Sequence, residues 1–232
     1  MDFKELLSRQ ASIYNSKPAL IFENTPLSFN ALARASFQVA NCFASQGVSA
    51  QDKVAVYLPN IPQAVLSFFG IFSLGACAVP LDFMLTQEEI IHFINHSEAK
   101  LLITIVKKDI DLGKIKEACP GLKTIIVCRE KAEGCLFWEE VITTAWDHVP
   151  QTHYNAQSLA AIFYTSGSTG CPKGVMLSYK NLNNPGKNIN NFLKISDRDV
   201  YLCGGVPFSH LGGLDYLLFM LEFGSTCVLL AR

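Results

Sequence analysis

The residues best suited to chemistry form a short loop between two apolar runs. Residues 163–178 read FYTSGSTGCPKGVMLS, and the centre of this stretch consists of glycine and hydroxyl residues with one cysteine, one proline and one lysine. Glycines let a ligand approach the backbone closely, and successive backbone N–H groups in turns form nests that bind anions. Lys173 adds a mobile positive charge, and Pro172 stiffens the approach to it. We interpret the loop as a phosphate-binding cradle, with a plain surface turn as the alternative.

Two familiar nucleotide-binding motifs do not fit the spacing of this loop. A P-loop needs G-x-x-x-x-G-K-[ST], whereas Pro172 precedes Lys173 here and Gly174 follows it. The dinucleotide fingerprint G-x-G-x-x-G is not supplied by the sequence GSTG at residues 167–170. The pattern therefore excludes an ordinary P-loop NTPase and a Rossmann dehydrogenase.

The loop lies within an alternation of β-rich runs and helical patterns. This alternation predicts an α/β protein with largely parallel β-sheets flanked by helices. Thr86 and Glu89 have the spacing of a helix capping box, and Gly47 fits the stop of a helix. The expected strands are 19–22, 54–58, 76–80, 100–105, 124–127, 159–164, 200–203 and 225–230, and the expected helices are 30–46, 62–74, 86–95, 110–118 and 210–222.

Size and charge narrow the class of protein. The chain has 232 residues, of which 50% are hydrophobic and 17% are charged, so it can bury a substantial core and is not disordered. Its formal net charge of −1 provides no basic field for nucleic acid, and we expect no nucleic-acid partner. The polar stretch at 147–157 predicts a soft boundary within an otherwise continuous domain.

The cysteines and the apolar segments bear on the compartment. None of the eight cysteines forms a CxxC pair, and the opening MDFKELLSRQ lacks the apolar core of a secretory signal. We expect reduced, buried thiols in a cytoplasmic protein. Residues 54–81 contain no Asp, Glu, Lys or Arg, but they read as a strand, a helix and a second strand. This predicts no transmembrane span and leaves peripheral membrane contact open.

At the loop the sequence resembles a known family. YTSGSTGCPKGVMLSYKNL closely resembles the signature loop of the acyl-adenylate-forming superfamily, which includes acyl-CoA synthetases, peptide-synthetase adenylation domains and luciferases. Two earlier segments also resemble segments of the family, in the same order along the chain: LSFNALARASFQVANCFASQGVSAQDKVAVYLPN and LGACAVPLDFMLTQEEIIHFINHSEAKLLIT. VPFSHLGGLDY resembles the P-x-x-H-x-x-G stretch of acyl-CoA and aryl-CoA ligases. The resemblance covers nearly the whole chain but only the front half of a family member.

The resemblance implies a two-step ligase that uses ATP, Mg²⁺ and coenzyme A. A carboxylic acid, of the fatty-acid type in the leading interpretation, attacks the α-phosphate of ATP, and a thiol then displaces AMP. His210 matches the family position beside the acyl pocket and the thiol tunnel, although a lone histidine there could also be structural. By resemblance the β- and γ-phosphates would be held by Thr165, Ser166, Gly167, Ser168, Thr169, Gly170 and Lys173.

Several family features are changed or missing among residues 1–232. Tyr179 stands where the family often has histidine, so we assign it no catalytic role, and Pro185 with Gly186 predicts a break in the helix after the loop. The adenine-binding Y-G-x-T-E pattern, the ribose-binding T-G-D segment and the small C-terminal lid domain do not occur. We therefore interpret the chain as the N-terminal part of an AMP-binding domain that is inactive by itself, with a loop that is disordered around 168–172 without ATP.

Other readings remain open. The chain could belong to an acyl-carrier-protein ligase or a peptide-synthetase adenylation domain, or it could be a short protein that binds a nucleotide or a partner without catalysis. His92 and His96 share a helix face but lack a third metal ligand, so we interpret them as a half-exposed face. Cys171 lies in the loop without an assigned role, and the run SFFGIFSLG is expected in the core.

Overall fold

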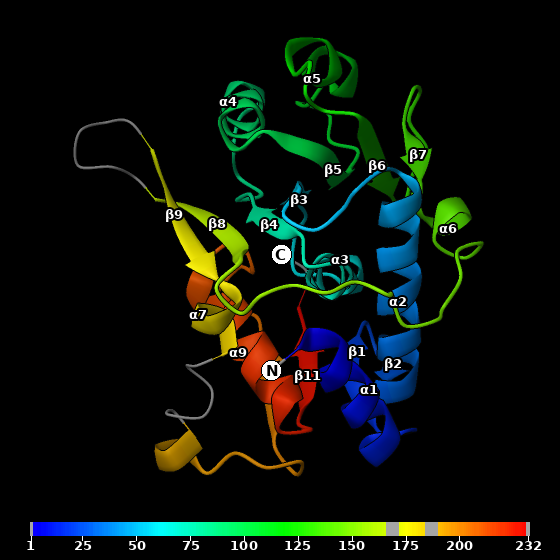
Figure 1. The fold of residues 1–232 in the computed structure, drawn as a ribbon, viewed down its shortest axis with the longest axis vertical. Coiled ribbons are helices and arrows are strands. Elements are labelled where there is room, and N and C mark those ends of the chain that lie inside the picture. Colours follow the sequence, from blue (N-terminus) through cyan, green and yellow to red (C-terminus); the bar gives the residue numbers. More distant parts are fainter. Residues whose placement is uncertain (1, 166–171, 184–189, 231–232) are drawn as a thin grey trace.

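The computed structural model describes residues 2–165, 172–183 and 190–230. They form a seven-stranded sheet of order β7-β6-β5-β3-β4-β8-β9 and a four-stranded sheet of order β10-β11-β1-β2 (Figure 1). The strands are β1 (Pro18–Phe22), β2 (Thr25–Ser28), β3 (Lys53–Tyr57), β4 (Cys77–Pro80), β5 (Ala99–Ile105), β6 (Thr124–Cys128), β7 (Leu136–Phe137), β8 (Leu159–Thr165), β9 (Lys173–Ser178), β10 (Val200–Cys203) and β11 (Thr226–Leu229). The helices are α1 (Phe3–Tyr14), α2 (Phe29–Ser45), α3 (Pro62–Ser73), α4 (Gln87–Ser97), α5 (Leu112–Ala118), α6 (Trp138–Val141), α7 (Tyr179–Asn183) and α9 (Leu211–Glu222).

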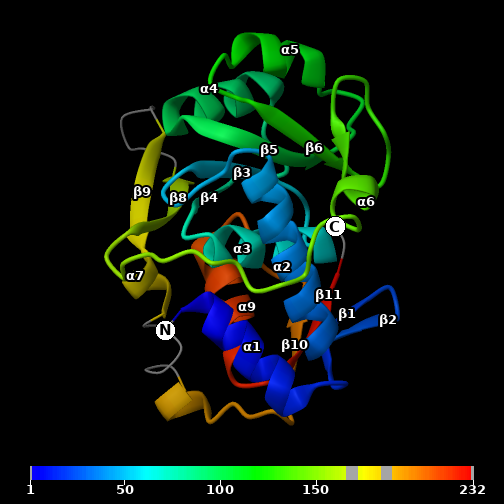
Figure 2. The ribbon, with the colours of Figure 1, turned by 45° about the vertical axis from the view of Figure 1, so that its right-hand side comes forward.

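The large sheet is parallel except at one edge. Strands β3 to β8 pair in parallel, and only β8 and β9 pair antiparallel. Helices α4 and α5 cover one face of this sheet, whereas α2 and α3 lie between the two sheets (Figure 2). Because both faces of the inner strands are covered, their residues are apolar without alternation. The predicted α/β class with largely parallel sheets is confirmed.

Helix α3 packs closely against α2 within the core. Gly70 permits this approach, because a Cβ atom there would lie 2.5 Å from Cγ1 of Val39. Phe68, Phe69 and Phe72 are buried beside this contact. Phe3 of α1 stacks on Phe72, with 4.8 Å between the ring centroids. The run SFFGIFSLG therefore belongs to the core, as the sequence predicts.

The first helix was not among the predicted elements. Helix α1 begins after Asp2, whose carboxylate accepts a hydrogen bond from the backbone N–H of Lys4, and it buries Phe3, Leu6 and Leu7. Half of its twelve residues are polar, so its apolar stripe is short in the sequence. The predicted capping box is confirmed, since the backbone N–H of Glu89 donates to Thr86 Oγ1 and that of Thr86 donates to Glu89 Oε2.

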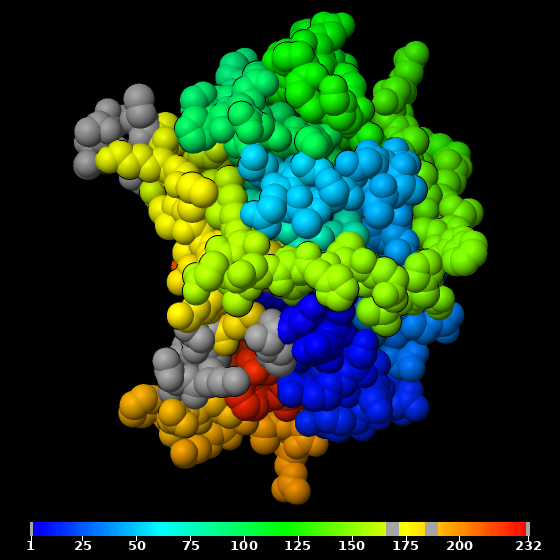
Figure 3. Space-filling view, viewed as in Figure 1, coloured from blue at the N-terminus to red at the C-terminus, as the bar shows by residue number. Residues whose placement is uncertain are grey.

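The chain between α6 and β8 crosses one face of the molecule (Figures 1 and 3). Lys4 Nζ donates to the carbonyl oxygen of Thr152, and Thr152 Oγ1 donates to the carbonyl oxygen of Ser73 at 2.7 Å. Asn41 Nδ2 donates to the carbonyl oxygen of Trp146 at 2.7 Å. The segment is thus tied to three helices, and the soft boundary near 147–157 stays a prediction.

Two further observations concern cysteines and helix length. The seven cysteines among the described residues are free, and burial raises the pKa of Cys42 to about 11 and that of Cys77 to about 12. Within the described ranges, none of the helices combines the length and the apolar character that crossing a bilayer requires.

Candidate active site

The glycine-rich loop joins the two strands of a hairpin at the edge of the large sheet. Thr165 ends β8 and pairs with Lys173, the first residue of β9. Strand β8 is buried against β4, whereas β9 is largely exposed. The structure therefore brings Thr165 and Lys173 together at the mouth of the loop. Ser166, Gly167, Ser168, Thr169, Gly170 and Cys171, and most of the stretch predicted to be disordered, lie outside the described residues, as does the predicted helix break at Pro185.

Helix α4 contacts the hairpin close to the mouth of the loop. The ring of Tyr164 stacks on Phe93, with 4.2 Å between centroids, and its hydroxyl lies 2.8 Å from Nδ1 of His96. His92 and His96 lie side by side, with 5.9 Å between ring centroids. No group of three metal-ligating side chains occurs in the described part of the chain. Contact with Tyr164 gives His96 a structural role at the hairpin.

His210 lies directly before α9, at the end of a loop that Asn60 holds in place. Asn60 Oδ1 accepts a hydrogen bond from the backbone N–H of Phe208 at 2.9 Å, and its Nδ2 donates to the carbonyl oxygen of Val206 at 3.1 Å. Gly213 allows the first turn of α9 to pack on this loop, because a Cβ atom there would collide with the carbonyl oxygen of Pro207. Asn60 was not among the predicted site residues; the only sequence signal was a polar side chain within a charge-free run.

The side chain of His210 contacts a carboxylate from the other side of the site. Its Nε2 lies 3.0 Å from Oδ2 of Asp82, and the two side chains are 60% and 34% exposed. Asp82 Oδ1 accepts a hydrogen bond from the backbone N–H of Met84 at 2.9 Å, which fixes the turn after β4. Sequence reasoning also missed Asp82, whose only signal is an acidic residue directly after a buried strand.

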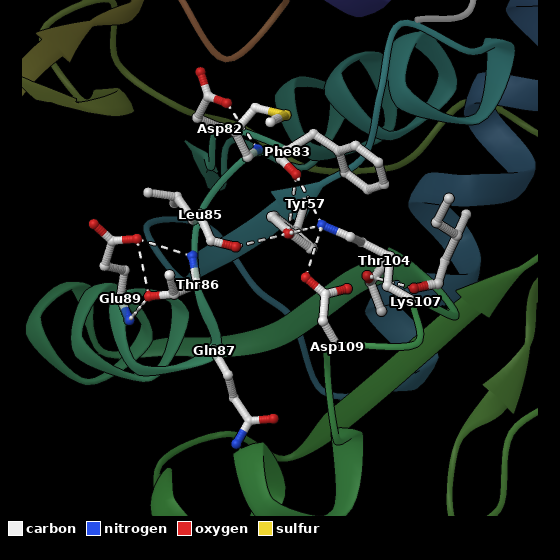
Figure 4. Close-up of polar contacts among 12 residues, drawn as sticks. Tyr57, Asp82, Phe83, Leu85, Thr86, Gln87, Glu89, Thr104, Lys107 and Asp109 are labelled. Atoms are coloured by element: carbon white, nitrogen blue, oxygen red, sulfur yellow. Dashed lines mark hydrogen bonds and ion pairs between the residues drawn. The ribbon is translucent and has the colours of Figure 1, made fainter.

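A polar cluster holds the turn that carries Asp82 (Figure 4). The hydroxyl of Tyr57 lies 3.1 Å from the carbonyl oxygen of Phe83 and 3.0 Å from that of Leu85. Lys107 Nζ donates to the same Phe83 oxygen at 3.1 Å and to the Tyr57 hydroxyl at 3.0 Å. Burial raises the pKa of Tyr57, and the nearby Lys107 opposes that rise. The turn is therefore tied to β3 and to the segment after β5 by partly buried polar contacts.

These parts meet at one cavity of about 480 Å³. Thr165 and Pro172, from the two arms of the loop, line this cavity, and so do Asp82 and His210. Much of the remaining lining is apolar, namely Pro80, Leu81, Leu85, Phe93, Phe163, Val175, Leu177 and Leu211. A second cavity of about 230 Å³ shares Asp82 and Ser209 with the first. Such an arrangement can hold a phosphate at the loop and an apolar group along the wall.

Tyr179, just after the hairpin, faces the core. Its ring is fully buried against Tyr154, with 4.1 Å between centroids, and its hydroxyl donates to the carbonyl oxygen of Ala76 at 2.6 Å. Burial raises the pKa of its hydroxyl well above the usual value. The side chain is thus a buried packing and hydrogen-bonding element.

Comparison with known families gives this site its context. Residues 7–232 match the model of the AMP-binding enzyme family. The chain belongs to that family. This match confirms the resemblance to the adenylate-forming enzymes, which extends beyond the loop to nearly the whole chain.

Individual relatives agree with this assignment. The chain is 29% identical over 231 residues to 4-coumarate–CoA ligase 2 of Solanum tuberosum, covering 95% of the chain and 41% of the relative. It is 30% identical to 2-succinylbenzoate–CoA ligase of Bacillus velezensis, covering 96% of the chain and 43% of the relative. The crystal structure of the anthranilate CoA ligase AuaEII with anthranoyl-AMP superposes with a TM-score of 0.92 at 25% identity, covering 100% of the chain and 45% of that structure. The chain thus spans less than half the length of these relatives.

Proposed function

We propose that these residues belong to an AMP-forming ligase that joins a carboxylic acid to coenzyme A. The observation that carries the proposal is the shared cavity, because the arms of a phosphate-type loop and His210 reach it from separate parts of the chain. In the first step the acid attacks the α-phosphate of ATP, and pyrophosphate leaves. In the second step the thiol of coenzyme A displaces AMP from the acyl-adenylate.

The loop residues would act mainly by positioning and by neutralising charge. Attack of one anion on another is slowed by repulsion, which preorganised donors relieve. Mg²⁺ would enter with ATP, because phosphate oxygens are its usual partners. The residues that we propose for the β- and γ-phosphates are Thr165, Ser166, Gly167, Ser168, Thr169, Gly170 and Lys173. His210 would act at the acyl end of the cavity.

The identity of the acid is a separate part of the proposal. The apolar lining around Leu81, Leu85 and Phe93 supports an acid with an apolar body, and a fatty acid is our first candidate. An aromatic acid is the second candidate, favoured by the coumarate, succinylbenzoate and anthranilate named in the relatives. A carrier protein in place of coenzyme A would point instead to a carrier-protein ligase or a peptide-synthetase domain.

Acid-dependent exchange of labelled pyrophosphate into ATP by the complete protein tests the first step. A panel of fatty and aromatic acids should give exchange with one class, followed by thioester formation when coenzyme A is added. We expect residues 1–232 alone to form little thioester, since they lack the Y-G-x-T-E and T-G-D segments. Nucleotide binding by the complete protein without exchange for any acid would overturn the proposal and favour a binding protein.

A further inference from the structure

The contact between Asp82 and His210 has a geometry that orients an imidazole ring. A ring nitrogen within 3.0 Å of a carboxylate oxygen donates its hydrogen, so a neutral imidazole in this contact is protonated at Nε2 and unprotonated at Nδ1. Among the described residues Nδ1 has no hydrogen-bond partner. Nδ1 is therefore the ring atom that remains available to a ligand.

The contact is built to orient the ring rather than to hold the fold together. Ion pairs between partly exposed side chains contribute little to stability, and these side chains are 60% and 34% exposed. The backbone segments that carry Asp82 and His210 are nevertheless fixed by hydrogen bonds. Lys107 and Tyr57 fix the turn that carries Asp82, and Asn60 fixes the loop that leads to His210.

The position of Asp82 and His210 indicates which step of the proposed reaction they would serve. Asp82 lies on the walls of both cavities, and His210 lies beside Ser209, which also lines both. A reactant in the smaller, largely apolar cavity would lie against Asp82 and Ser209, and His210 lines the larger cavity beside them. Of the proposed reactants, the carboxylate and the phosphates are ionised at neutral pH, and only the thiol has a proton to lose.

We propose that Asp82 is a positioning residue for the thiol step, which it serves by holding His210 as the Nε2–H tautomer. This inference rests on the proposed function. In the step, the thiol proton passes to Nδ1 of His210 as the sulfur–carbon bond forms. The bond between the acyl carbon and the phosphate oxygen breaks, and AMP leaves with that electron pair.

The substitution Asp82→Asn separates this role from a structural one. Its side-chain oxygen can still accept from the backbone N–H of Met84, so the turn is kept while the negative charge is lost. Glu88→Gln is the matched control, because Glu88 is an exposed carboxylate on the next helix and does not line either cavity. In the complete protein we expect Asp82→Asn to slow thioester formation by about tenfold, below the roughly 100-fold loss that a displaced catalytic group can cause, with pyrophosphate exchange unchanged. Glu88→Gln should change neither step.

A double-mutant cycle shows whether Asp82 acts through His210. We expect His210→Ala to slow the thiol step at least as much as Asp82→Asn, and the double variant to be no slower than His210→Ala alone. Additive losses, or equal losses in both steps, would overturn the proposal. A wild-type protein that catalyses neither step would refute the proposed function instead.

Nitrogen NMR of the complete protein labelled with ¹⁵N-histidine tests the tautomer independently of turnover. The His210 signal is assigned by its disappearance in His210→Ala. The proposal requires a protonated Nε2 and an unprotonated Nδ1 in the neutral ring, with that preference lost in Asp82→Ala. A wild-type His210 protonated at Nδ1 would contradict the proposal even if the enzyme were inactive.

Discussion

Strands β3 and β9 belong to the same sheet but serve it differently. Four of the five residues of β3 are buried, and the strand has parallel neighbours on both sides. Strand β9 is an antiparallel edge strand whose side chains are exposed or half-exposed along its whole length. The first contributes mainly to the core, and the second carries Lys173 at the mouth of the loop.

The difference between the two strands separates regions that stabilise the fold from regions that carry polar side chains near the cavity. The inner strands and α3 bury apolar surface, which supplies most of the stability of such a domain. Strand β9 and the loop before α9 contribute less burial, and polar side chains such as those of Lys173 and His210 lie on them. Substitutions in the first region should therefore change stability, and substitutions in the second should change chemistry.

The largest effect is expected from Phe72→Ala in the core. Phe72 is fully buried and stacks on Phe3, so its removal leaves a cavity and should lower the free energy of unfolding by about 4 kcal/mol. Denaturant unfolding measures this change. Phe192→Ala is the control, since that ring is 87% exposed, and its substitution should have almost no effect. Equal losses in the free energy of unfolding for the two variants would contradict the assignment of stability to the buried core.

Lys173→Ala should produce the opposite pattern. Lys173 is exposed at the mouth of the loop, so unfolding should be unchanged. Pyrophosphate exchange by the complete protein should fall by about 100-fold, as expected for the loss of one preorganised charge. Lys180→Ala, on the exposed surface of α7, provides a matched loss of charge and should retain full exchange. Normal exchange in Lys173→Ala would remove this residue from the proposed phosphate site.

Tyr179→Phe tests the comparison between core and hairpin at a residue that directly follows β9 but is buried in the core. The hydroxyl donates to the carbonyl oxygen of Ala76 in the core, so its loss should lower the free energy of unfolding by about 1.5 kcal/mol. Pyrophosphate exchange should be unaffected, because the ring faces away from the cavity. A large loss of exchange with unchanged stability would assign Tyr179 to the chemistry instead.

Asp215→Asn should give a small effect that depends on pH. Burial raises the pKa of Asp215 from 3.8 to about 6, and its Oδ1 is buried without a hydrogen-bond partner among the described residues. A raised carboxyl pKa favours the folded state most below pH 3.8, and this contribution is lost as the pH rises to about 6. At pH 7 the substitution should therefore stabilise the fold, by about 1 kcal/mol after allowance for partial exposure. Unfolding curves at pH 4 and pH 7 should differ less for the variant, and a destabilised variant at pH 7 would contradict this account.

The sequence predicts the parts of this molecule that depend on local pattern. The inner strands, α3 and the capping box at Thr86 are evident because burial and capping each leave a short-range signal. The phosphate role of the loop stays a prediction, made from glycine, hydroxyl groups and a lysine that lie close together in the chain. Helix α1 was missed because its apolar stripe is short and needs α3 to complete it.

The supporting contacts of the site could not be predicted in this way. Asp82 and His210 are 128 residues apart in the sequence, and Asn60 and Phe208 are 148 apart. Their pairing follows from the packing of the sheets and helices, which no local pattern records. A family resemblance points to His210 itself, but the carboxylate that orients it becomes visible only in three dimensions.

The most direct test of the account is a crystal structure of the complete protein with a non-hydrolysable acyl-adenylate analogue. We expect the acyl carbonyl to lie in the cavity of about 480 Å³, within reach of His210, and the phosphate-mimicking group to be directed from there towards the mouth of the loop at Thr165. The contact between His210 and Asp82 should be retained. An analogue bound away from this cavity, or one with its acyl group remote from His210, would contradict the claim that the hairpin and His210 form one site.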